Sequence, residues 1–339
     1  MNKQKKSLLQ SPIEHIDIKS FDSTKIIDSF SDMAFQSRNL ARASKIFESM
    51  IKDEECSIIL CLAGSLVSAG LKHAIADLIK CNMVDCIVST GANIVDQDFF
   101  EGLGFSHYKG SPNVDDNVLR ELMVDRIYDT FIDEEELRAC DNTIKQIADE
   151  MSPGIYSSRE FIVEMGGFLK KYHPEIFGIT LEAFRNDVPI FCPAFSDSSA
   201  GFGLVEHQYN NPKSHVAIDS VKDFRELTML KTKAKETGLM MIGGGVPKNF
   251  VQDTVVAADI LGIDSPMHKY AIQLTVADER DGALSGSTLK EANSWGKVDV
   301  GSEQMVFGEA TLTFPLLASY VYHQGNWKSR PKQKLNLVL

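Results

Sequence analysis

The stretch IILCLAGSLVSAGLKHAIADLIKCNMVDCIV, residues 58–88, decides the fold because it alternates between two kinds of hydrophobic pattern. Residues 58–62 form an unbroken apolar run, which predicts a strand buried on both faces. Residues 67–80 follow an amphipathic helical pattern, and residues 86–88 return to an apolar run. Two strands joined by a helix predict parallel neighbours in one sheet.

The same alternation continues along the rest of the chain. Further strands are expected at Phe191 and at residues 215–218, 239–242 and 270–274, with helices at residues 222–237 and 249–261. We therefore predict an α/β fold, a doubly wound and mainly parallel sheet covered by helices on both faces.

The segment 115–172 departs from this alternation because its pattern is charged and helical. Residues 133–136 (DEEE) suit a first helical turn, where the positive end of the helix dipole favours carboxylates. We interpret the segment as a helical insertion within one domain, residues 35–325. An N-terminal arm (1–34) precedes this domain, and a loosely packed C-terminal tail (326–339) follows it.

The composition narrows the class of partner. The 339 residues carry 47 acidic and 35 basic side chains, a net charge of −12 at pH 7. This charge repels nucleic acid and favours polycations, although it would also keep any cytosolic protein soluble. The most apolar window, residues 57–71, is shorter than the roughly 18 to 20 residues that cross a membrane. We expect a cytoplasmic protein with no nucleic-acid or membrane partner.

The six cysteines have neither C-x-x-C spacing nor histidines at zinc-finger spacing, so we expect reduced thiols and no metal site. The basic residues at the amino terminus precede no apolar signal segment, which argues against secretion.

Residues 292–297 (ANSWGK) place Lys297 two positions after an indole, Trp295. A free lysine has a pKa of about 10.4 and is a poor nucleophile at neutral pH. An apolar wall that partly desolvates the amine favours its neutral, nucleophilic form, which imine chemistry requires. Taken alone, the triplet is equally compatible with a surface lysine beside a core aromatic.

Two loops at expected strand ends are rich in small residues. The glycines at residues 243–245 precede a helix whose Pro247 suits the first turn, and glycine lets backbone N–H groups approach an anion at a helix N-terminus. Gly244 is expected to have a positive φ. Residues 89–93 (STGAN) form a similar turn after the strand at 86–88. The G-x-G-x-x-G fingerprint is missing, and either loop alone could be a tight turn.

Several ordered blocks show that the chain resembles the deoxyhypusine synthase family from Phe35 to about Tyr322. The blocks are residues 35–43 (FQSRNLARA), 66–71 (LVSAGL), 82–85 (NMVD), 89–93 (STGAN), 193–197 (PAFSD), 243–248 (GGGVPK), 294–297 (SWGK) and 310–317 (ATLTFPLL). Each block is short, but their joint occurrence in the family's order is specific.

The resemblance implies an NAD-dependent enzyme that cleaves a polyamine and carries its four-carbon unit on Lys297. A hydride passes from the carbon beside an amine to the nicotinamide, and Lys297 attacks the resulting imine. The first amine departs, which leaves the four-carbon unit on Lys297 as a Schiff base. An acceptor amine then displaces the lysine and the hydride returns, so the net redox change is zero. The lysine must be neutral when it attacks, and the pocket must be closed and dry.

The resemblance also implies the residues of the site and a homotetramer with active sites between subunits. Those expected to hold NAD are Ser65, Ser68, Thr90, Gly91, Ala92, Asp96, Asp197, Gly243, Gly244, Gly245, Val276, Ala277, Glu309 and Ala310. Those expected to bind the amine are Trp295, Glu291, Asn249, Asp281, Gly282 and Ser285. The carboxylates of Asp197 and Glu309 could accept hydrogen bonds from ribose hydroxyls, which favours NAD over NADP.

Three positions depart from the family pattern. Phe202 and Leu284 stand where the eukaryotic members have amine-binding aspartates, and Asn249 stands where they have a histidine. Each lost carboxylate–ammonium contact costs on the order of 1.5 to 3 kcal/mol. We therefore expect the same reaction on a different amine pair, drawn from putrescine, spermidine and agmatine, with homospermidine or a guanidino-polyamine as the product.

Two alternatives stay open at this point. One is true deoxyhypusine synthesis on a translation-factor lysine, and the other is a non-catalytic module that binds NAD or polyamine. A sirtuin-like deacylase is disfavoured because the cysteine spacings do not supply its four-cysteine zinc site.

Overall fold

The computed structural model describes residues 3–333 and 335–338. Met1 and Asn2 of the expected N-terminal arm, and Lys334 and Leu339 of the expected tail, lie outside the described residues. Within the described part of the chain, no helix is long and apolar enough to cross a membrane.

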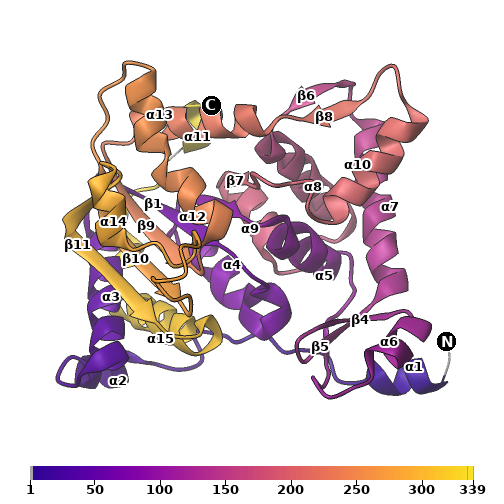
Figure 1. Cartoon of the computed structure of the whole chain (residues 1–339), viewed down its shortest axis with the longest axis horizontal. Coiled ribbons are helices and arrows are strands. Elements are labelled where there is room, and N and C mark those ends of the chain that lie inside the picture. Colours follow the sequence, from indigo (N-terminus) through magenta and orange to yellow (C-terminus); the bar gives the residue numbers. More distant parts are fainter. Residues whose placement is uncertain (1–2, 334, 339) are drawn as a thin grey trace.

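A six-stranded parallel sheet forms the centre of the molecule (Figure 1), and it confirms the predicted α/β fold. Its strand order is β11-β10-β9-β1-β2-β7. The strands are β1 (Cys56–Leu62), β2 (Cys86–Ser89), β7 (Ile190–Phe191), β9 (Glu236–Ile242), β10 (His268–Thr275) and β11 (Val298–Phe307).

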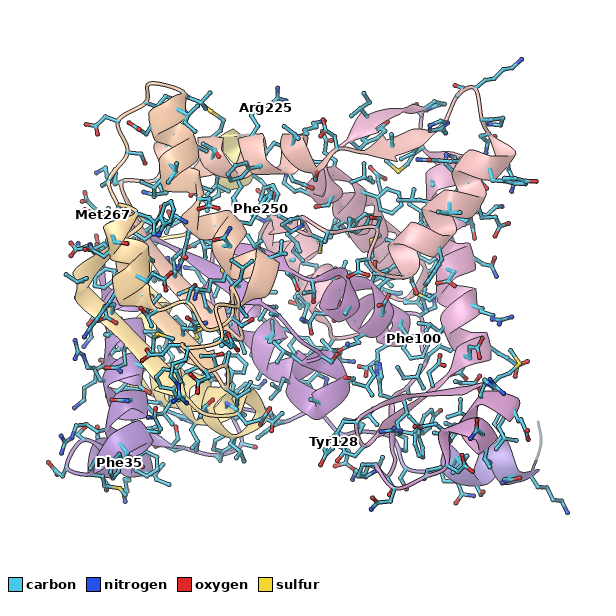
Figure 2. The ribbon with its side chains drawn as sticks, in the orientation of Figure 1. Phe35, Phe100, Tyr128, Arg225, Phe250 and Met267 are labelled. Atoms are coloured by element: carbon cyan, nitrogen blue, oxygen red, sulfur yellow. The ribbon has the colours of Figure 1, made fainter. Side chains whose placement is uncertain are left out.

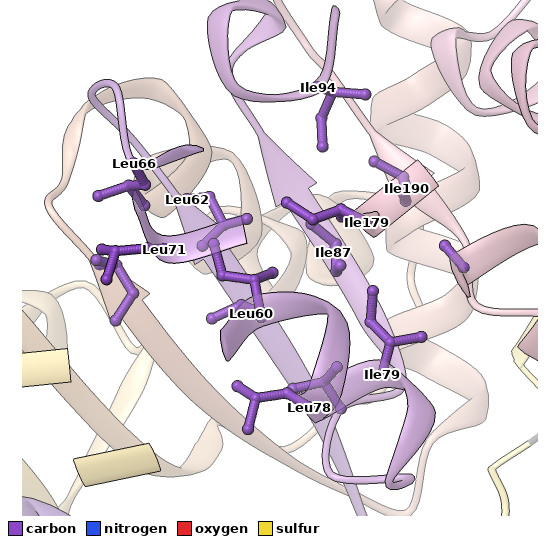
Figure 3. Close-up of a cluster of buried hydrophobic side chains, with 14 of the residues drawn as sticks. Leu60, Leu62, Leu66, Leu71, Leu78, Ile79, Ile87, Ile94, Ile179 and Ile190 are labelled. Atoms are coloured by element: carbon purple, nitrogen blue, oxygen red, sulfur yellow. The ribbon is translucent and has the colours of Figure 1, made fainter. Parts of the chain in front are cut away.

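All seven residues of β1 are buried, because its side chains alternate between two cores. Ile58, Leu60 and Leu62 enter the larger core, part of which is shown in Figure 3. Ile59 and Cys61 enter the smaller core on the opposite face. Helices thus cover both faces, as a doubly wound sheet requires.

The helices on the larger core include α2 (Thr24–Phe30), α3 (Phe35–Lys52), η1 (Val67–Leu71), α4 (Lys72–Lys80), η2 (Ala92–Phe99), α5 (Phe100–Gly102), α7 (Glu134–Glu150), α8 (Ser158–Tyr172), α9 (Ile179–Asn186), α10 (Ser199–Asn210) and α15 (Ala310–Gln324). Those on the smaller core include α11 (Ser220–Lys233), α12 (Gly245–Gln252), α14 (Leu289–Ser294) and η4 (Leu335–Val338). The remaining helices are α1 (Lys3–Leu8), α6 (Asp116–Glu121), α13 (Thr254–Ile260) and η3 (Asn326–Ser329).

Several helix boundaries differ from the prediction. The helix expected at 67–80 is interrupted at Gly70, whose φ of 91° is incompatible with a regular helix. The helix expected at 222–237 ends at Lys233, because Glu236 already pairs with Cys56 in the sheet. The helix expected at 249–261 begins earlier, at Gly245, and is divided into α12 and α13.

The strand expected at 215–218 does form, as β8 (Val216–Ile218), but it lies outside the main sheet. It pairs with β6 (Gly154–Tyr156) in a separate two-stranded sheet. The preceding helix α10 packs on α7, away from the main sheet (Figure 1), and His207 Nδ1 there lies 2.6 Å from Asp149 Oδ1.

The segment 115–172 is not wholly helical, contrary to the prediction. It also contains the hairpin β4 (Val124–Ile127) and β5 (Thr130–Asp133), and β5 pairs with β3 (Tyr108–Lys109) on its other side. The hairpin turns at Tyr128, which has a φ of 50° and an exposed side chain (Figure 2). The expected acidic first turn is confirmed, because Glu134 begins α7 and the Asp133 side chain caps it.

The C-terminal tail is not loosely packed, again contrary to the prediction. The Arg330 side chain is buried and pairs with the buried Asp85 carboxylate, with Nη2 2.5 Å from Oδ2 and Nη1 3.0 Å from Oδ1. Its guanidinium also donates to the backbone oxygens of Asn82 and Cys56. The tail is therefore bound to the strand ends that begin β1 and β2.

We expect Arg330→Met to destabilise the fold by about 3 to 5 kcal/mol, because it leaves the Asp85 carboxylate buried without its partner. Urea denaturation measures the loss, with Lys332→Met on the exposed part of the tail as the matched control. Equal stabilities in the two variants would contradict the structural role of the ion pair.

Candidate active site

A cleft of about 420 Å³ opens where the carboxyl ends of β1, β9, β10 and β11 meet. Open parallel sheets bind ligands at this edge. Eight of the predicted residues line the cleft: Ser65, Gly243, Gly244, Val276, Ala277, Ser285, Glu309 and Ala310. Small side chains and exposed backbone dominate this lining.

The glycine loop is shaped by a close contact with Ser285. Gly243 and Gly245 have φ values of 79° and 61°, which favour glycine. Gly244 does not have the expected positive φ, because its φ of −163° is extended backbone. A Cβ at Gly244 would instead lie 2.9 Å from Ser285 Cβ and would collide with its Cα. Glycine is therefore required here by close approach.

The loop leads directly into α12, and Pro247 lies in the first turn as predicted. On the opposite rim, Glu309 caps α15 and accepts a 2.8 Å hydrogen bond from the Thr311 N–H. The cleft thus combines a helix N-terminus, which suits a phosphate, with an exposed carboxylate, which suits a hydroxyl. These features fit a dinucleotide.

A second group of predicted residues lies at the end of β2 and does not line the cleft. Gly91 packs closely on Ser198, since a Cβ there would lie 2.6 Å from Ser198 Oγ. Asp96 Oδ1 accepts a 2.6 Å hydrogen bond from the Ser199 N–H, and burial raises the pKa of Asp96 to about 6. Thr90 and Ala92 belong to the same turn, and Asp197 is exposed beside it.

Ser68 does not face the cleft, although it was expected to hold the cofactor. Its side chain is buried and its hydroxyl donates to the Ser65 carbonyl at 3.2 Å. Its N–H donates to the buried Gln97 side chain at 2.8 Å. Ser68 therefore joins η1 to η2 within this chain.

Lys297 directly precedes β11, where its carbonyl accepts from the His268 N–H, so it lies at the amino ends of β10 and β11 and does not line the cleft at their carboxyl ends. Two side chains lie near Lys297. Its Nζ is 2.5 Å from Asp253 Oδ1 and 5.2 Å from the centroid of the Trp295 ring. Asp253 Oδ2 accepts a 2.7 Å hydrogen bond from Asn249 Nδ2. The predicted lysine, indole and amide therefore come together around a carboxylate that the sequence analysis missed. The sequence feature that could have revealed Asp253 is its spacing from Asn249, which is one helical turn.

Of the other predicted amine-binding residues, Ser285 lines the cleft, whereas Glu291, Asp281 and Gly282 are exposed and do not line it. Glu291 completes a capping box with Thr288 in this helix, which confirms the expected helical turn before Trp295. The Asp281 carboxylate accepts from the Ala283 N–H at 2.8 Å, and Gly282 has open space around it. Trp295 is 67% exposed and lines a separate hollow of about 300 Å³ with Asp259 and Asp264.

The comparisons with known proteins now bear on this geometry. A family model described as deoxyhypusine synthase matches residues 25–321. The chain belongs to the deoxyhypusine synthase family. It is 62% identical to the deoxyhypusine synthase-like protein of Chlorobaculum parvum, covering 99% of this chain and 96% of that protein. It is also 62% identical to the deoxyhypusine synthase-like protein of Coxiella burnetii, covering 98% and 95%.

The fold agrees with a crystal structure in the same family. An Entamoeba histolytica protein described as a deoxyhypusine synthase superposes with a TM-score of 0.60, at 21% identity, over 92% of this chain and 97% of that one. Members of the deoxyhypusine synthase family are enzymes, but the names of these relatives specify neither the amine substrate nor the acceptor.

We expect Gly244→Ala to weaken binding of the anticipated NAD cofactor at least tenfold, because the new Cβ displaces Ser285 from the cleft wall. Calorimetric titration of the folded variant measures the affinity. Gly301→Ala in β11 is the control, because a Cβ there meets nothing nearer than 3.4 Å. Undiminished affinity in Gly244→Ala would remove this loop from the cofactor site.

Proposed function

We propose that this member of the deoxyhypusine synthase family is an NAD-dependent transferase that moves an aminobutyl or guanidinobutyl group between small amines through an imine on Lys297. The observation that carries the proposal is the position of Lys297, between the face of Trp295 and the carboxylate of Asp253. The products are free polyamines, such as homospermidine or a guanidino-polyamine.

Asp253 performs two tasks in this proposal. It holds the Lys297 ammonium before the substrate arrives, and it then accepts the ammonium of the incoming amine in its place. Once displaced, Lys297 lies beside an indole, and its side chain is only 12% exposed. The Trp295 face can also stack on a substrate cation.

The cleft supplies the cofactor site in this proposal. When bound, NAD accepts and later returns the hydride, so that the transfer has no net redox change. The backbone N–H groups that begin α12 bind its phosphates, and Glu309 binds a ribose hydroxyl. The cysteines in the described residues are all free thiols, which fits the proposed cytoplasmic setting.

We also propose that the active site is completed by a second copy of the chain, within a homotetramer. Two observations support this. The predicted residues of the β2 turn, including Asp96 and Asp197, lie outside the cleft, although the family pattern assigns them to the same site. In addition, large apolar side chains are exposed beside the predicted residues, with Val276 at 74% and Phe202 at 69%.

We expect Lys297→Arg to abolish transfer while NAD binding is retained, because arginine remains protonated and forms no imine. Borohydride should trap a four-carbon adduct on Lys297 in the unmodified protein and none in the variant. The exposed Lys290, substituted in the same way, serves as the control. Transfer by Lys297→Arg at the original rate would refute the covalent mechanism.

The exposed Leu284 provides a test of substrate choice. We expect Leu284→Asp to raise activity with spermidine relative to putrescine or agmatine on the order of tenfold or more, because it adds one charge-assisted hydrogen bond. The control is Ile155→Asp in β6, which adds the same charge at another exposed position. Competition assays with mixed amines measure the ratio, and equal ratios in both variants would show that Leu284 does not face the amine.

A further inference from the structure

Lys248, in the first half of α12, is a buried lysine to which the proposed mechanism assigns no task. Its side chain is among the largest fully buried ones, with the residue only 1% exposed. Four oxygens surround Nζ: Gln273 Oε1 and Ser287 Oγ at 3.0 Å, the Leu284 carbonyl at 3.3 Å and the Ser287 carbonyl. None of them belongs to a carboxylate, so the ammonium is held by dipoles alone.

These contacts join three parts of the cleft wall. Gln273 lies in β10, and its Nε2 donates to the carbonyls of Gly243 at 2.9 Å and Ser285 at 3.1 Å. Lys248 holds the Gln273 oxygen and so completes a chain of hydrogen bonds from the glycine loop to residues 276–288. That segment, the connection from β10 to α14, supplies Val276, Ala277 and Ser285 to the cleft. It also carries Asp281, Gly282 and Ser285, three of the six residues expected to bind the amine.

We propose that Lys248 is a positioning residue whose buried amine clamps residues 276–288 against the glycine loop and so sets the width of the cleft. It is not a second nucleophile, because main-chain and side-chain oxygens enclose Nζ. This role rests on the proposed function and adds to it, because Lys248 is the side chain that holds the wall of the proposed cofactor cleft in place.

Protonation should control the clamp. Burial lowers the pKa of Lys248 to about 8, with Lys297 lowering it further and Glu291 and Cys61 opposing the shift. When the segment opens, Nζ meets water and its pKa returns toward about 10.4, so the closed segment binds the proton less tightly than the open one. Proton loss therefore favours the closed segment, in which the neutral amine keeps two N–H donors for the surrounding oxygens. The clamp is strengthened as the pH rises through about 8.

NAD titrations between pH 6.5 and 9.5 test the proposal in the unmodified protein, Lys248→Met, Lys248→Arg and the surface control Lys290→Met. The unmodified protein and the control should gain affinity as the pH rises through about 8. Lys248→Met should bind at least tenfold more weakly at pH 7, with no such alkaline gain. Lys248→Arg should show no alkaline gain either, because arginine remains charged. An unchanged profile in Lys248→Met would overturn the clamp.

Limited trypsin cleavage after the exposed Arg280 reports how firmly residues 276–288 are held. The assay needs no NAD, and in the unmodified protein it needs no substitution. Normalised to a small peptide substrate, cleavage should slow severalfold from pH 7 to 9 in the unmodified protein. In Lys248→Met it should be faster at pH 7 and should not slow between pH 7 and 9. If the protein binds no NAD, the proposed function fails, but this assay still decides the clamp. A cleavage rate independent of pH in the unmodified protein would refute it.

Discussion

The burial of β1 between two cores is the constraint on which the rest of the structure depends. Each of its seven residues is buried, so helices must cover both faces of the sheet, and its neighbours β2 and β9 run parallel to it. Parallel strands bring their carboxyl ends to one edge. The glycine loop after β9, the segment after β10 and the cap of α15 after β11 therefore converge there, and together with the loop after β1 they form the candidate cleft.

The sequence predicted this framework because apolar runs and helical periods are local patterns. It missed β11 because this edge strand has an exposed face, with Asp299, Val300 and Gly301 at its start, and so carries no apolar run. It missed the hairpin at Tyr128 because that turn lacks the glycine or asparagine that usually marks one. The burial of Arg330 depends on Asp85, which lies 245 positions away, and no local pattern reports such a contact.

The candidate site shows the same division between local and distant information. The glycine loop and the lysine after Trp295 are motifs, and the family resemblance located them. Asp253 and Lys248 acquire their roles only in three dimensions, by meeting Lys297 and residues 284–287. The two lysines also have contrasting surroundings: Lys297 faces a carboxylate, whereas Lys248 is enclosed by uncharged oxygens. This contrast fits the two roles that we propose: Lys297 is the amine that a substrate frees to react, and Lys248 is the amine that holds the site together.

The choice of acceptor is the central claim, because the family membership fits both a free amine and a protein lysine. Incubation with NAD, a panel of di- and polyamines and the hypusine-bearing translation factor, followed by mass spectrometry of all products, tests it most directly. The account predicts a free polyamine that contains a transferred four-carbon unit, with putrescine or agmatine as acceptor. Efficient modification of the translation-factor lysine, with the free diamines left unchanged, would contradict it.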